Sequence, residues 1–192
     1  MDEFDQMKAS LLSGRPTVFG PDGAAAVQQH KLLASDVHRA AKLNAHKRDE
    51  KEGQQWVRYV TEHFPEGRNG QADAMALWTD WRTSLLKRNT VGPGITITHG
   101  QSHAHWHRAP TGEVCLNIED MWDDFESSVE HFIAEAREAQ HDRREAILKR
   151  WRNSTFEIRQ LIGSDYGMLT SATAVSSMTI IDLPPQPPPK SE

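Results

Sequence analysis

A cluster of histidines is the feature of this sequence that most directly suggests chemistry. The chain contains ten histidines, and four of them lie within nine residues: His99, His103, His105 and His107. Side chains two residues apart on a β-strand point to the same face, about 6–7 Å from one another. Imidazoles in such a row can converge on one metal ion. Zinc accepts imidazoles together with a thiolate or a carboxylate, and it activates a bound water when one position stays open. The pattern therefore predicts a candidate zinc site.

A turn after the histidines sets the register of the hairpin to which they belong. Pro110 followed by Gly112 fits a type I turn closed by a left-handed glycine, which is the usual three-residue hairpin loop. This register separates an apolar face, with Trp106, from a polar face that carries a row of three outward-facing imidazoles. It places His107 opposite Cys115, His105 opposite Asn117 and His103 opposite Glu119. The candidate metal ligands are His103, His105, His107, Cys115 and Glu119.

Other uses of the histidine row stay open on the sequence alone. The imidazoles could be solvated side chains of an exposed sheet face, or a pH-sensitive interface, because the unperturbed pKa of histidine is about 6.5. They could also act as acid–base groups without a metal. The spacing matches neither HExxH nor paired CxxC. The chain also contains no G-x-S-x-G, phosphate-loop or dinucleotide-binding motif.

A second candidate surface lies on a basic helix around Trp151. Lysine and arginine side chains gathered on one helix could bind nucleic-acid phosphates. An order of acidic residues first and basic residues last also stabilises any long helix through its dipole. The candidate nucleic-acid contacts are Arg143, Arg144, Lys149, Arg150 and Arg152.

The elements that would position these residues indicate an α+β fold, with a mainly helical body and a small antiparallel hairpin sheet. β-Branched or alternating patterns predict strands over about residues 95–99, 103–108 and 113–118. Asn117 is a good N-cap, and the acidic residues after it predict a long helix from near residue 119. The spacing of Trp122, Phe125 and Val129 gives this helix an apolar face that packs on the sheet. Upstream, we expect helices over residues 2–13, 24–52, 54–64 and 72–88.

Changes in composition along the chain predict its domain organisation. Glycine and proline punctuate the chain after the first helix, and the C-terminus is proline-rich. We expect an N-terminal docking helix over 1–14, a linker over 15–23, a single α+β domain over 24–183 and a disordered proline-rich tail over 184–192.

Composition also limits the functions that the chain can have. The net charge of −5 gives no overall attraction to nucleic acid or anionic lipid. A single cysteine excludes an internal disulfide and a multi-thiolate zinc site. The N-terminus lacks the apolar run of a signal peptide, and no apolar run approaches the about 20 residues of a membrane span. We therefore expect a cytosolic protein.

On these grounds the first hypothesis is a non-catalytic accessory or regulatory protein that binds a protein partner, with a homodimer as one form of that partnership. The first alternative is a metal-binding protein or a small metal-dependent hydrolase, with zinc on the His103/His105/His107 strand face. The second alternative is contact with nucleic acid through the basic helix at 143–152.

Overall fold

The computed structural model describes residues 1–19, 23–47, 49–100 and 105–164, with side chains as far as residue 154. The chain divides into two compact units, Met1–Trp151 and Arg152–Glu192. The predicted proline-rich tail over 184–192 lies outside the described residues. In chain order the elements are α1 Glu3–Leu12, α2 Gly23–Leu43, α3 Glu52–His63, α4 Gln71–Ala76, η1 Leu77–Thr83, α5 Ser84–Arg88, β1 Ile95–Thr98, β2 His107–Arg108, β3 Val114–Asn117, α6 Ile118–Glu138 and α7 His141–Ser164.

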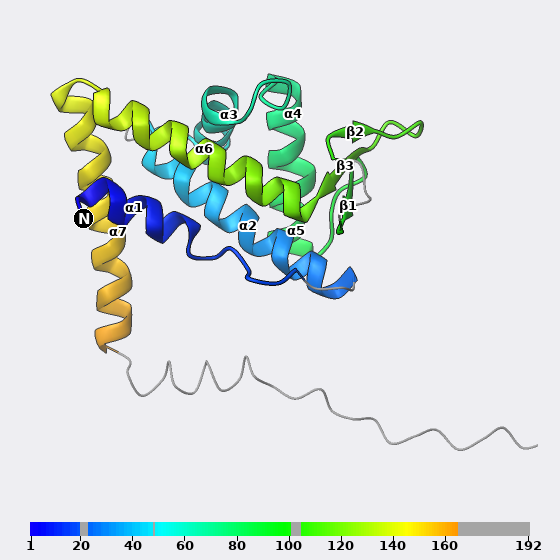
Figure 1. Ribbon diagram of the computed structural model, residues 1–192, viewed down its shortest axis with the longest axis horizontal. Coiled ribbons are helices and arrows are strands. Elements are labelled where there is room, and N and C mark those ends of the chain that lie inside the picture. The colour runs from blue at the N-terminus through cyan, green and yellow to red at the C-terminus, as the bar shows by residue number, and fades with distance from the viewer. Residues whose placement is uncertain (20–22, 48, 101–104, 165–192) are drawn as a thin grey trace, which may run out of the picture. The chain divides into compact units, whose positions relative to one another are not determined.

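Helix α6 is the element on which the first unit is built, and its start is encoded locally. The side chain of Asn117 accepts hydrogen bonds from the backbone N–H groups of Glu119 and Asp120, which have no partner inside the helix. The helix contacts α1, α2 and α3, and it runs alongside α2 in Figure 1. Its buried face contains Trp122, Phe125, Val129, Phe132, Ile133 and Ala136. The predicted long helix and its apolar face are confirmed, and each large side chain buried there contributes about 1.5–3 kcal/mol.

Helix α1 packs on its own chain. Phe4, Met7 and Leu11 are buried, and the helix contacts α2 and α6. A capping box between Asp2 and Asp5 fixes its first turn. The guanidinium of Arg137, on α6, lies 3.1 Å from the first of these carboxylates and 2.5 Å from the second. The helix that we expected to dock is therefore docked within the chain described here.

The helices between α2 and the sheet differ in detail from the prediction. Helix α2 ends at Leu43, and the expected helix over 72–88 contains the π-helical segment η1. π-Helical turns are rare and occur mostly as single-turn segments inside α-helices. Leu77 and Trp81, in η1, are buried, whereas Met75, in α4, is 51% exposed.

The sheet is mixed, with strand order β1-β3-β2. Strands β2 and β3 pair antiparallel with His107 opposite Cys115, and Gly112 closes the loop with a φ of 92°. This is the predicted hairpin register. Strand β3 is central, and β1 runs parallel to it on the edge opposite β2. The α+β fold is confirmed, and the expectation of a wholly antiparallel sheet is corrected at β1.

The C-terminal part of the described chain contains two helices. Helix α6 ends at Glu138, and Ala139 has an extended backbone with ψ of 153° before α7 begins. The long helix predicted from near residue 119 and the basic helix at 143–152 are therefore separate elements. Helix α7 continues through Asn153 to Ser164. Within the described residues, none of the helices has both the length and the apolar character that a membrane span requires.

Candidate metal centre

The predicted row of outward-facing imidazoles is corrected by the backbone at Trp106. This residue has a φ of 53°, a left-handed conformation that non-glycine residues adopt rarely. The strand therefore shortens to His107–Arg108, and the residues on either side of Trp106 no longer alternate as in a regular strand. The imidazole of His107 is exposed, whereas the side chain of His105 is only 5% exposed. These two imidazoles lie in different environments instead of sharing one face.

His105 belongs to a buried network around Asp124 of α6. Its Nε2 lies 2.9 Å from Asp124 Oδ2, and its Nδ1 accepts a hydrogen bond of 3.1 Å from the backbone N–H of Asn117. An Nδ1 that accepts leaves the proton on Nε2, which donates it to the carboxylate. Trp106 Nε1 donates to the same oxygen, and Arg68 binds the other oxygen of Asp124. Both nitrogens of His105 therefore have hydrogen-bond partners. Nε2 connects the hairpin to α6, and Nδ1 binds the last residue of β3.

The other predicted metal ligands are His103, Cys115 and Glu119. His103 lies outside the described residues. Cys115 carries a half-buried free thiol on β3. Glu119 accepts a hydrogen bond of 2.9 Å from the backbone N–H of Gly100. Among the described residues, the other four predicted ligands do not form a group of three close enough to hold one metal ion.

The predicted basic surface is divided between internal contacts and solvent. Arg143 donates to Asn44 Oδ1 at 2.6 Å, and Arg150 donates to the carbonyl of Leu43 at 3.2 Å. Both contacts tie α7 to the end of α2. Arg144 is half-buried, and Lys149 and Arg152 are exposed.

A different group of potential ligands forms where α3 meets α6. His63, His131 and Glu135 each offer one ligand atom, and these atoms all lie within 4.8 Å of one another. His131 and Glu135 are one helical turn apart on α6, so their side chains share a face. His63 is the last residue of α3, which packs on α6. Two imidazoles and a carboxylate are a donor set that zinc and other divalent transition metals accept.

His63 is the fixed member of this group. Its side chain is 0% exposed, and neither ring nitrogen has a hydrogen-bond partner among the described residues. A buried polar group without a partner costs about 1–3 kcal/mol, which a metal ion would offset at one nitrogen. Burial, together with the charges of His131 and Arg143, lowers the pKa of His63 to about 4. The imidazole is therefore neutral at pH 7, the form that binds metals.

The other two members can adjust. A tetrahedral ion with bonds of about 2.0–2.1 Å separates its ligand atoms by about 3.3 Å, so the group must close slightly around a metal. His131 and Glu135 are exposed, and their rotamers can change at little cost. The carboxylate oxygen of Glu135 already lies 3.7 Å from Nδ1 of His63. The arrangement combines one immobile imidazole with two mobile ligands.

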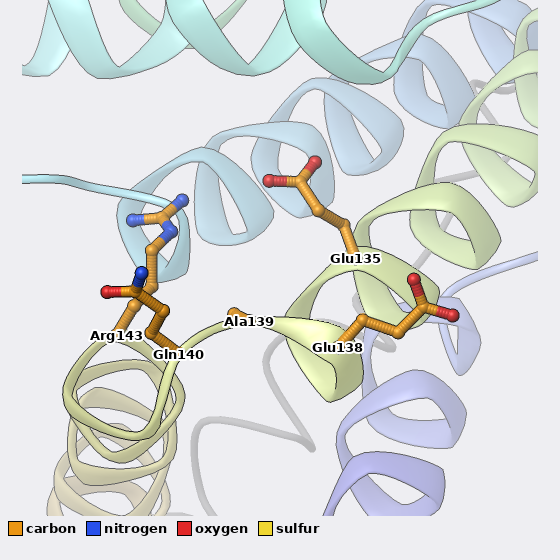
Figure 2. Close-up of a pocket in the computed structure, with 5 residues that line it drawn as sticks. All are labelled: Glu135, Glu138, Ala139, Gln140 and Arg143. Atoms are coloured by element: carbon orange, nitrogen blue, oxygen red, sulfur yellow. The ribbon is translucent and has the colours of Figure 1, made fainter.

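A pocket of about 330 Å³ lies beside Glu135, at the turn between α6 and α7. Figure 2 shows that Glu135 and Arg143 extend toward the same side of this turn, whereas Glu138 points away from Arg143. The pocket leaves the solvent side of Glu135 accessible. Its lining residues are Glu135, Glu138, Ala139, Gln140 and Arg143.

The sequence contains a weak signal for this group. His131 and Glu135 are four residues apart on a predicted helix, which is the spacing that brings two ligands to one face. The third member, His63, lies far away in the sequence on another helix. Its burial and its lack of a partner depend on how α3 packs on α6, so the spacing alone does not identify it.

Comparison of the chain with protein-family models, with curated proteins and with solved structures gave no match.

Proposed function

We propose that this protein binds a divalent transition-metal ion, zinc in the first instance, through His63, His131 and Glu135. The observation that carries the proposal is the buried imidazole of His63, whose two nitrogens have no partner in the described structure although two further metal-ligand side chains stand beside it. Three protein ligands leave at least one coordination position for water or for a donor from another molecule.

The geometry favours binding over catalysis. Two of the three ligands are exposed at the surface. Substrate sites, by contrast, usually bury most of their ligand in a cleft with a few converging polar groups. A metal held between α3 and α6 instead cross-links two helices. The proposed setting is the cytosol, where a single cysteine stays reduced.

Metal titration of tag-free protein tests this proposal. We expect one zinc ion per chain by elemental analysis and by calorimetric titration. His131→Ala is expected to weaken binding at least 100-fold, because it removes one of three protein ligands. His105→Ala is the matched control, since that imidazole is committed to Asp124 and Asn117, and its affinity for zinc should equal that of the wild type. Loss of zinc in the His105 variant with retention in the His131 variant would contradict the assignment.

A second candidate function is the binding of a protein partner, for which we propose a second copy of this chain. The observation that favours it is a surface hollow of about 440 Å³ between α3 and α4, where Val57 and the exposed side chain of Met75 are surrounded by polar side chains. An apolar centre with a polar rim is the arrangement found in association surfaces.

Light scattering coupled to size exclusion tests the self-association. We expect a dimer mass for the wild type and a monomer mass for Met75→Glu, because a buried unpaired carboxylate opposes association. Leu32→Glu is the control, since Leu32 is also exposed, at 48%, but lies on α2 outside the hollow. A monomeric wild type, or a Met75→Glu variant that still dimerises, would rule this surface out as the dimer contact.

A further inference from the structure

We infer that Glu62 is the carboxylate that orients and polarises His63 for metal binding, and that Asn44 and Arg143 hold Glu62 in position. This inference rests on the proposed metal site. Its starting point is that the two nitrogens of His63 face different carboxylates. Nδ1 lies 3.7 Å from Glu135 Oε2, on the side of the ligand group, and Nε2 lies 3.8 Å from Glu62 Oε2.

An imidazole that binds a metal almost always donates its other N–H to a carboxylate, a carbonyl or water. Nδ1 of His63 points toward Glu135 and is the nitrogen available to the ion. Nε2 then carries the proton, and Glu62 is the acceptor nearest to it. The distance of 3.8 Å needs to shorten by less than about 1 Å to reach hydrogen-bond length. Metal binding at Nδ1 and donation from Nε2 to Glu62 would each favour the other, because both require the same tautomer.

Glu62 is itself held in place from the opposite side. Nδ2 of Asn44 donates to Glu62 Oε2 at 3.0 Å, and Asn44 is only 1% exposed. Arg143 donates to Oδ1 of the same amide at 2.6 Å, which fixes its orientation. The result is a relay from a guanidinium through an amide to a carboxylate that faces His63. Each link joins a different element: α7, the end of α2 and α3.

The relay gives Arg143 a role within the chain. The guanidinium lines the pocket shown in Figure 2, as does Glu135, and it donates a hydrogen bond to Asn44. A protonated guanidinium has no free lone pair with which to bind a metal ion. Arg143 is therefore a positioning residue, as is Glu62, and neither is a metal ligand.

Substitution of Glu62 tests the inference in the full-length chain. Glu62→Gln removes the negative charge that polarises the imidazole, and the loss of such an outer carboxylate typically weakens metal binding about 10–100-fold. We expect that loss in zinc titrations at pH 7, with partial recovery in Glu62→Asp, which keeps the charge. The side chain of Glu62 is 38% exposed, so the variants are compatible with folding, and equal melting temperatures in EDTA would verify this. Glu138→Gln is the matched control, because Glu138 is another exposed carboxylate and lines the pocket beside Glu135.

A spectroscopic readout separates polarisation from a general structural effect. In the zinc-loaded wild type, proton NMR should show a downfield Nε2–H resonance from His63, and in Glu62→Gln that resonance should move upfield or vanish by exchange. An unchanged affinity and an unchanged resonance in Glu62→Gln would overturn the inference while the metal site of the wild type stands. A wild type that binds no zinc would overturn both the inference and the proposed function.

Discussion

Lowering the pH from 7 to 5 is expected to destabilise the metal-free protein by about 4 kcal/mol, a large part of the stability of an ordinary domain. Burial lowers the pKa of His30 to about 3 and that of His38 to about 4. Burial likewise lowers the pKa of His63 to about 4. The unfolded chain binds protons at these imidazoles near pH 6.5, whereas the folded chain does not until the pH falls well below 5. Each imidazole therefore costs about 2 kcal/mol of stability at pH 5.

One carboxyl group acts in the opposite direction. Burial raises the pKa of Asp36 to about 6, although the charge of Arg39 lowers it. The folded state therefore disfavours ionised Asp36, and protonation between pH 7 and pH 5 returns about 1 kcal/mol. The net loss follows from the three imidazoles less this gain. The destabilisation by the imidazoles continues to grow until the pH falls below about 3, the folded pKa of His30, and it disappears as the pH rises above about 6.5.

Urea unfolding at pH 7 and pH 5 in the presence of EDTA measures this loss. His30→Gln keeps an acceptor for the indole N–H of Trp81, which now donates to His30 Nδ1 at 3.1 Å, and removes the titration. The variant should lose about 2 kcal/mol less than the wild type between the two pH values. His141→Gln is the control, because His141 is exposed in the folded protein. Equal stability of the wild type at the two pH values would contradict the burial of these imidazoles.

Zinc is expected to stabilise the protein by about 3 kcal/mol when the free ion is present at 100 times its dissociation constant. For a chain of this size that free energy corresponds to a rise in melting temperature of about 5–10 °C. The physical reason is that the ion binds a pair of helices that exists only in the folded state. Because the ligand nitrogens must be unprotonated to bind the ion, the stabilisation should diminish in acid.

Thermal melts with zinc and with EDTA measure the second effect. His131→Ala should melt at the same temperature with zinc and with EDTA, because the loss of one of the three ligands prevents zinc from binding at this concentration. His105→Ala should start from a lower melting temperature, because Asp124 loses one of its hydrogen bonds, and should still respond to zinc. A zinc response that survives in the His131 variant would place the ion elsewhere.

Much of the local structure could be predicted from the sequence, because it depends on short-range chemistry. The loop from Pro110 to Gly112 fixed the pairing of His107 with Cys115, and the side chain of Asn117 fixed the start of α6. The apolar spacing after Trp122 identified the buried face of that helix. Each of these features depends only on a hairpin turn, a helix N-cap or the helical spacing of apolar residues.

The structure departs from the prediction where backbone irregularities, or packing between segments far apart in the sequence, determine the position of a side chain. The left-handed Trp106 turned His105 toward Asp124, and nothing in the residue type signals that conformation. The π-helical segment within the helix expected over 72–88 is likewise a backbone irregularity that the residue types do not signal. The ligand group was missed because His63 contributes to it only through the packing of α3 on α6, a contact between segments far apart in the chain.

X-ray absorption at the zinc edge of the loaded protein tests the metal site most directly. For the wild type, the proposed site predicts nitrogen and oxygen neighbours at about 2.0–2.1 Å from zinc, together with outer-shell scattering from two imidazoles. In His131→Ala, the scattering from one of these imidazoles should be lost. A sulfur neighbour at about 2.3 Å would instead locate the ion at Cys115, on the hairpin. That result, or a spectrum unchanged in His131→Ala, would contradict the assignment of the ion to His63, His131 and Glu135.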